Sequence, residues 1–261
     1  MRIGAPISLP AYAALALALT VASAAACGGG LFRQYEYEEE IYLSLDGSAT
    51  VYVNSSVPAL NALRGSTFDP SGTARIDRAA IRNFFTTPVT RVTRLSTSRR
   101  SNRRFVHVRL DVDDVRRLGE AAPFAWSSYQ FGKDGELYVY RQAIDAAAGK
   151  DVGNVGWTDR ELVAFRMHLP SKIVYHNTLS GVGRGNILAW EQLLADRLRG
   201  TPLTLDARME TQSILYRTLW LFGATLVAVA ISFGLVIWRV LRRGARTPVG
   251  ADPRVRPRPD P

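Results

Sequence analysis

Residues 35–57 read YEYEEEIYLSLDGSATVYVNSSV, and this stretch decides the fold class. Polar and apolar residues alternate on both sides of Asp46 and Gly47. Such alternation is typical of strands with one face in a core, and Asp-Gly is a favoured hairpin turn. We therefore predict a β-hairpin. Glu36, Glu38 and Glu40 should share one face of its first strand, because alternate side chains point the same way.

Further hairpins follow along the chain. Residues 89–95 and 105–112 are β-rich and flank STSRRSNRR, which we interpret as a hairpin with a long basic tip. Residues 124–131 and 136–142 predict a third hairpin, and short strands continue to residue 210. Helices are expected at residues 58–63, after Pro58, and at residues 77–85, capped by Asp77. The prediction is an α+β domain of mostly antiparallel β-hairpins, with a few helices on one face.

Residues 218–238 form an uncharged apolar run, TLWLFGATLVAVAISFGLVIW. As a helix this run would be about 31 Å long, which matches a hydrocarbon core of about 30 Å. Four arginines follow it closely, at positions 239, 242, 243 and 246. The positive-inside rule then predicts a single-pass membrane protein with a cytoplasmic C-terminus and an extracytoplasmic domain.

The N-terminus is typical of a secretory signal. Arg2 precedes an apolar segment at residues 11–22, and the small residues Ala24, Ala25 and Ala26 offer a cleavage site. Cys27, the single cysteine of the chain, follows directly and precedes three glycines, as in a bacterial lipobox. We predict that Cys27 is lipidated. Ordinary cleavage that leaves a free thiol is the alternative.

These features divide the chain into five predicted segments. The order is a signal peptide (1–26), a lipobox cysteine with a short linker (27–34), the extracytoplasmic domain (35–212), a transmembrane helix (213–240) and a disordered basic cytoplasmic tail (241–261). Of the net charge of +10, residues 239–261 contribute seven arginines and two aspartates. The exported domain therefore has a modest charge, and nucleic acid is not expected as a partner.

The end of the domain carries a recognisable pattern between residues 165 and 209. Its marks are Pro170, Val174, Asn177 (one residue early for a Val-x-x-x-Asn step) and a Gly-Asn-x-x-x-Trp motif at Gly185, Asn186 and Trp190. This pattern resembles the LppM-like domain of bacterial envelope lipoproteins. The resemblance implies an envelope protein without a known catalytic centre that contacts lipids or glycolipids.

Catalytic and cofactor motifs are missing from the sequence. His107, His168 and His176 have no partner at a metal-ligand spacing, and residues 181–185 lack the lysine of a phosphate-binding loop. The acidic residues 36–40 are interpreted as a solvated strand edge, with a divalent-cation site as the alternative. We predict no enzyme activity, no cofactor and no metal site.

Arg99, Arg100, Arg103 and Arg104 are the best candidates for an interaction site. Four guanidinium groups at one hairpin tip would attract phosphate or carboxylate groups. On a domain held at the bacterial cell membrane, the expected partners are membrane lipids, an envelope glycolipid or another envelope protein. The leading hypothesis is a non-enzymatic lipid- or glycolipid-binding protein, and the alternative is a scaffold or assembly subunit of an envelope complex.

Overall fold

The computed structural model describes residues 33–244, which fall into two compact units. The first unit ends at Thr211 and the second begins at Gln212. Cys27 and the predicted signal peptide lie outside the described residues, as does most of the predicted tail. The elements, in chain order, are β1 (Tyr35–Leu43), β2 (Ala49–Ser56), α2 (Val57–Arg64), α3 (Arg78–Phe85), β3 (Thr90–Arg100), β4 (Arg103–Val112), the 3₁₀ helices η1 (Val115–Glu120) and η2 (Ala122–Phe124), β5 (Ser127–Asp134), β6 (Leu137–Ile144), β7 (Leu162–His168), β8 (Ser171–His176), β9 (Ile187–Leu193), α4 (Leu194–Leu198), β10 (Leu203–Ser213) and α5 (Ile214–Gly244).

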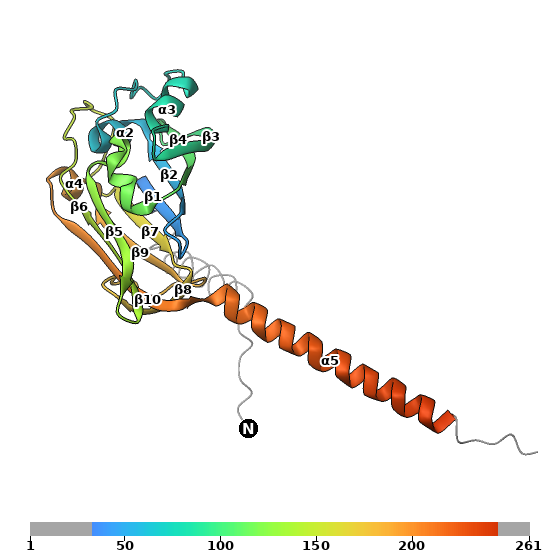
Figure 1. Cartoon of the computed structure of the whole chain (residues 1–261). Helices are drawn as coiled ribbons and strands as arrows, with labels where there is room; N and C mark the ends of the chain where they lie inside the picture. The colour runs from blue at the N-terminus through green and yellow to red at the C-terminus, as the bar shows by residue number, and fades with distance from the viewer. Residues whose placement is uncertain (1–32, 245–261) are drawn as a thin grey trace, which may run out of the picture. The chain divides into compact units, whose positions relative to one another are not determined.

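The strands of the first unit form two sheets (Figure 1). A six-stranded sheet has the order β3-β4-β2-β1-β7-β9, and a four-stranded sheet has the order β5-β6-β10-β8. Within the six-stranded sheet every pairing is antiparallel except that of β1 with β7. The predicted α+β class, with mostly antiparallel hairpins and few helices, is confirmed.

Two short helices pack against the six-stranded sheet, close to the predicted ranges, and the predicted cap at Asp77 is confirmed. The Ser56 hydroxyl accepts a hydrogen bond from the amide of Ala59, which starts α2, and Gly65 ends it with a φ of 70°. The Asp77 carboxylate accepts from the amides of Ala79 and Ala80 and starts α3. Side-chain acceptors of this kind satisfy amides that have no partner within the helix. α2 contacts β1, β2 and β4, and α3 contacts β3 (Figure 1).

One hydrophobic core joins both sheets and the helices. Its fully buried members include Leu60 of α2, Phe124 of η2, Tyr140 of β6 and Phe165 of β7. Leu60 and Phe165 are more than a hundred residues apart in the sequence, so this core joins distant segments of the first unit.

Within the described residues, the second unit is formed by the end of β10 and the long helix α5. Its segment Ile214–Arg242 has a mean hydropathy of 2.3 and is long and apolar enough to cross a membrane. The hydroxyls of Thr218, Thr225 and Ser232 donate to carbonyls four residues earlier. These polar groups are therefore satisfied within the helix, as a hydrocarbon environment demands.

Candidate functional site

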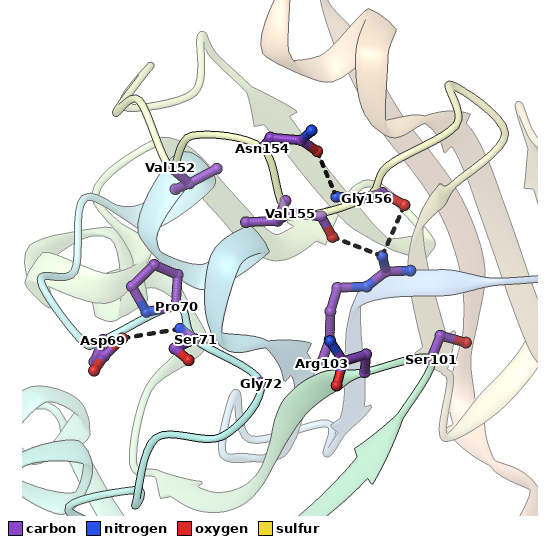
Figure 2. Close-up of a pocket in the computed structure, with 11 residues that line it drawn as sticks. Asp69, Pro70, Ser71, Gly72, Ser101, Arg103, Val152, Asn154, Val155 and Gly156 are labelled. Carbon is purple, nitrogen blue, oxygen red and sulfur yellow. Dashed lines mark hydrogen bonds between the residues drawn. The ribbon is translucent and has the colours of Figure 1, made fainter.

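A cleft of about 490 Å³ opens at the turn between β3 and β4, and we call it the polar cleft (Figure 2). Three segments meet there: the turn itself, the loop at residues 65–77 and the loop at residues 145–161. The lining residues are Asp69, Pro70, Ser71, Gly72, Ser101, Asn102, Arg103, Val152, Asn154, Val155 and Gly156. Hydroxyls, amides and main-chain groups dominate this set, so the cleft suits a ligand that exchanges many uncharged hydrogen bonds.

Short polar side chains shape the two loops. The Asp69 carboxylate accepts from the amide of Ser71 at 2.9 Å, and the Asn154 side chain accepts from the amide of Gly156 at 3.1 Å (Figure 2). Such Asx turns replace the regular pairing that the loops lack. Gly72 is required because a Cβ at this position would lie 1.8 Å from the carbonyl oxygen of Asn102. The loop therefore contacts the hairpin turn directly.

Arg103 forms the floor of the polar cleft and is not a free cation. Only 5% of the residue is exposed. Its Nη1 donates to the carbonyls of Val155 and Gly156 at 3.0 and 3.1 Å (Figure 2). Its Nη2 pairs with the buried carboxylate of Glu36 at 3.0 Å. Arg103 thus ties the loop at residues 145–161 to β1 and β4.

The predicted long basic tip is wrong. β3 continues to Arg100, β4 begins at Arg103, and the turn contains only Ser101 and Asn102, both with positive φ. Two such residues form the tight turn that matches the twist of paired strands. The sequence did not predict these longer strands because residues 96–104 show no alternation of polar and apolar residues. The strands pair there through backbone hydrogen bonds, which do not require alternation.

The four arginines consequently form two cross-strand pairs, Arg99 with Arg104 and Arg100 with Arg103. Successive side chains of a strand point to opposite faces, so the four do not converge. Nη2 of Arg100 donates to the carbonyl of Tyr35 at 2.5 Å, and its guanidinium lies 4.6 Å from the centre of the Phe105 ring. Arg100 and Arg103 therefore have structural contacts of their own.

Arg99 and Arg104 remain as an opposed pair of like charges. Neither forms an ion pair within residues 33–244, and the buried Nε of Arg104 has no hydrogen-bond partner there. Nη2 of Arg99 donates to the side chain of Asn102 at 2.6 Å, and Asn102 lines the polar cleft. Like charges placed opposite each other destabilise a sheet, so this pair would gain from a nearby anion.

The acidic run does not form a solvated edge. β1 lies between β2 and β7, and Glu36 and Glu39 are 0% and 1% exposed. Arg103 pairs with Glu36, and Arg64 of α2 pairs with Glu39. Within residues 33–244, no group of three or more His, Cys, Asp or Glu side chains is placed to hold a metal ion.

The histidines of the six-stranded sheet are held by neighbouring side chains. The ring nitrogens of His107 lie 3.0 Å from the Asn54 amide oxygen and 2.8 Å from the Ser98 hydroxyl. Burial, with a smaller effect of Arg100, lowers the pKa of His107. His168 contacts Glu40 and stacks on the Tyr42 ring, with centroids 3.8 Å apart. Both contacts are local features of a sheet surface.

The polar cleft was missed by sequence reasoning. Its two loops do carry a signal, because turn-forming residues cluster at 69–72 (DPSG) and 151–156 (DVGNVG). That signal marks loops without showing that they meet. Their meeting depends on contacts that are distant in sequence. Lys150 of one loop donates to the Ser66 carbonyl of the other, 84 positions away, and the partners of Arg103 lie 52, 53 and 67 positions away.

Comparison with known proteins yields little. No protein-family model matches the chain, and no curated protein matches it. Among solved structures, the chain is similar to the NMR structure of the folded domain of LppM from Mycobacterium tuberculosis, at 11% sequence identity and a TM-score of 0.38. The match covers 70% of this chain and 94% of that domain. The similarity is distant, and membership of the LppM-like family stays a prediction.

Proposed function

We propose that this chain is a membrane-anchored envelope protein without enzymatic activity, whose domain binds an anionic, hydroxyl-rich lipid headgroup at the polar cleft. The observation that carries the proposal is the junction of two chemistries at one place. A cleft lined mainly by uncharged hydrogen-bonding groups, with the carboxylate of Asp69 among them, meets the turn between β3 and β4, where Arg99 donates to Asn102 of the lining. Arg99 and its cross-strand partner Arg104 have no counter-ion among residues 33–244.

In this proposal the cleft residues and the arginines bind different parts of the headgroup. Hydroxyl and amide groups, such as those of Ser71 and Asn154, would bind the hydroxyls of the headgroup. Arg99 and Arg104 would bind its phosphate, because guanidinium groups form strong charge-assisted hydrogen bonds to phosphate oxygens. Arg103 would hold the loop at residues 145–161 in place without contacting the phosphate. In this proposal α5 anchors the domain on the outer side of the membrane, with the basic tail in the cytoplasm.

Vesicle binding tests the proposal. The full chain, reconstituted in phosphatidylcholine nanodiscs, is mixed at low salt with vesicles of phosphatidylcholine alone or with phosphatidylglycerol. We expect wild-type protein to sediment with the anionic vesicles only. The double variant R99Q/R104Q should bind them several-fold less, and added salt should weaken wild-type binding because exposed charges are screened.

A matched control has the same change in net charge. Arg116 and Arg117 are exposed and pair with Asp114 and Glu120, away from the cleft. The variant R116Q/R117Q should bind anionic vesicles almost as well as wild type. An equal loss in both double variants would show a general charge effect and would contradict a site at Arg99 and Arg104. Mass spectrometry of lipids that co-purify with the wild-type chain would then identify the headgroup.

One observation favours a second function, that of an assembly subunit. β8 is an edge strand of the four-stranded sheet, and Val174 and Tyr175 on it are 56% and 47% exposed. Leu179 and Val182 in the following loop are also exposed. An apolar sheet edge is suited to pairing with a strand of another protein. Crosslinking in native membranes would give a discrete protein adduct through this edge if the chain acts as a scaffold.

A further inference from the structure

Trp126, which directly precedes β5, lies in a buried polar network that has more donors than acceptors. Two guanidinium groups flank its ring. The Cζ atom of Arg64 lies 3.7 Å from the ring centroid, and that of Arg197, from α4, lies 5.8 Å from it. The side chain of Arg64 is 1% exposed, and Arg197 is 0% exposed. Two positive charges are therefore buried next to one indole.

The carboxylate of Glu39 balances only one of these charges, and its acceptor capacity is filled. One oxygen accepts from Arg64 Nη2 and the Tyr37 hydroxyl, and the other accepts from the Tyr129 hydroxyl and Gln142 Nε2. Four donors match the lone-pair sites of a carboxylate. The amide oxygen of Gln142 accepts from the Tyr140 hydroxyl.

The hydrogen bonds of Arg197 within residues 33–244 go to neutral groups. Its Nη1 and Nη2 donate to the main-chain carbonyls of Ile144 and Asp145 at 3.3 and 2.8 Å. The Asp145 side chain is exposed and forms no ion pair with Arg197 in the described part of the chain. Burial lowers the pKa of Arg197; the charge of Asp145 opposes this shift, and that of Arg64 adds to it. The buried network thus holds two guanidinium groups and one carboxylate, and the second positive charge is offset only in part, by an exposed aspartate.

Three buried donors around Trp126 have no acceptor in residues 33–244: Arg64 Nη1, Trp126 Nε1 and Arg197 Nε. An unsatisfied buried donor costs about 1–3 kcal/mol, and a charged one costs more. A water molecule would accept from these donors and could donate to the second lone pair of Gln142 Oε1, but it would bring no negative charge to the two buried guanidinium groups. A group with lone pairs, no hydrogens and a negative charge satisfies both deficits.

We propose that a small monovalent anion of the halide class binds beside Trp126, between Arg64 and Arg197. The site is distinct from the polar cleft, which is lined by other residues. Its role would be structural. The anion would join α2, α4 and the start of β5 by supplying the negative charge that the buried arginines lack.

Thermal unfolding of the full chain in detergent tests the site. Sodium chloride or bromide is titrated against sodium gluconate at matched ionic strength, since gluconate is too large for a buried site. An anion that binds only the folded state raises the unfolding midpoint by roughly 3–6 °C per tenfold increase in concentration once the site is nearly filled. We expect this rise with the halides and not with gluconate.

The variant R197M should lose the halide dependence, because it removes the second positive charge. R116Q, which removes an exposed arginine, should retain it. If R197M does not fold, bromide soaked into crystals of the wild-type chain decides the question by its anomalous signal beside Trp126. Equal effects of halide and gluconate, or density for ordered water only at this position, would overturn the proposal.

Discussion

Strand β1 carries two kinds of glutamate within five residues. Glu36 and Glu39 are buried and pair with Arg103 and Arg64, whose side chains are equally inaccessible. Glu38 and Glu40 lie on the open side of the sheet, where they pair with the half-buried Arg166 and His168 of β7. All four acids are glutamates. The two kinds of pair therefore differ mainly in burial: two lie inside the domain, and two lie at its surface and are partly solvated.

The difference follows from the cost of removing charge from water. An exposed ion pair contributes between zero and about 1 kcal/mol, because water already solvates both partners. A buried pair contributes little net stability as a pair, but removal of one partner leaves the other without solvent or counter-ion. The predictions below use this contrast, from the largest expected effect to the smallest.

The substitution E39Q should have the largest effect. It leaves Arg64 charged and buried, while Tyr129 and Gln142 lose a charged acceptor. We expect the free energy of unfolding to fall by about 3–5 kcal/mol. Denaturant unfolding of the full chain in detergent, followed by tryptophan fluorescence, measures the change.

A charge-removing second substitution sharpens this test. The double variant E39Q/R64M no longer buries an isolated cation, so it should be more stable than E39Q alone. A loss below about 1 kcal/mol for E39Q, the range of an exposed pair, would show that the burial contrast does not govern these residues.

The substitution R103Q should act on stability and on one loop together. It leaves the buried carboxylates of Glu36 and Glu161 without their cation, and it removes the donors to Val155 and Gly156. We expect a loss of about 3 kcal/mol and faster proteolysis within residues 145–161. Limited proteolysis with mass spectrometry locates the cuts. Proteolysis that is faster everywhere, with no preference for this loop, would argue against its role as a clamp.

The same contrast explains what was predictable from sequence. The hairpins, the proline at the start of α2 and the cap at Asp77 depend on neighbours in the chain, so local patterns suffice. The parallel pairing of β1 with β7 joins residues more than a hundred positions apart, and no local pattern encodes it. The burial of Glu36 and Glu39 was unpredictable for that reason. In a sequence a glutamate is normally interpreted as a surface residue, and only the structure shows that Arg103 and Arg64 pair with these two.

Of the two half-buried pairs, Glu38 with Arg166 gives the better control for E39Q, because Glu38 is the adjacent residue and water still reaches both side chains. The substitution E38Q should change the free energy of unfolding by less than about 1 kcal/mol. The difference should shrink further in high salt, since exposed charges are screened. A loss comparable to that of E39Q would mean that this face of the sheet is covered in the folded protein.

The smallest effect should appear only in the pH dependence of stability. The hydrogen bond with His168 lowers the pKa of Glu40 in the folded protein below its ordinary value. A carboxylate with a lowered folded pKa adds stability that is complete above the unfolded pKa and is lost as the pH falls through the folded one. The substitution H168Q reduces this difference, because the charge of His168 is lost while Tyr42 and Arg166 still lower the pKa of Glu40. The acid limb of the stability curve should therefore become less steep in this variant. Above the carboxylate range the two curves should run parallel. Unfolding midpoints of wild type and H168Q at a series of acidic and neutral pH values measure this, and parallel curves throughout would show that His168 does not shift the titration of Glu40.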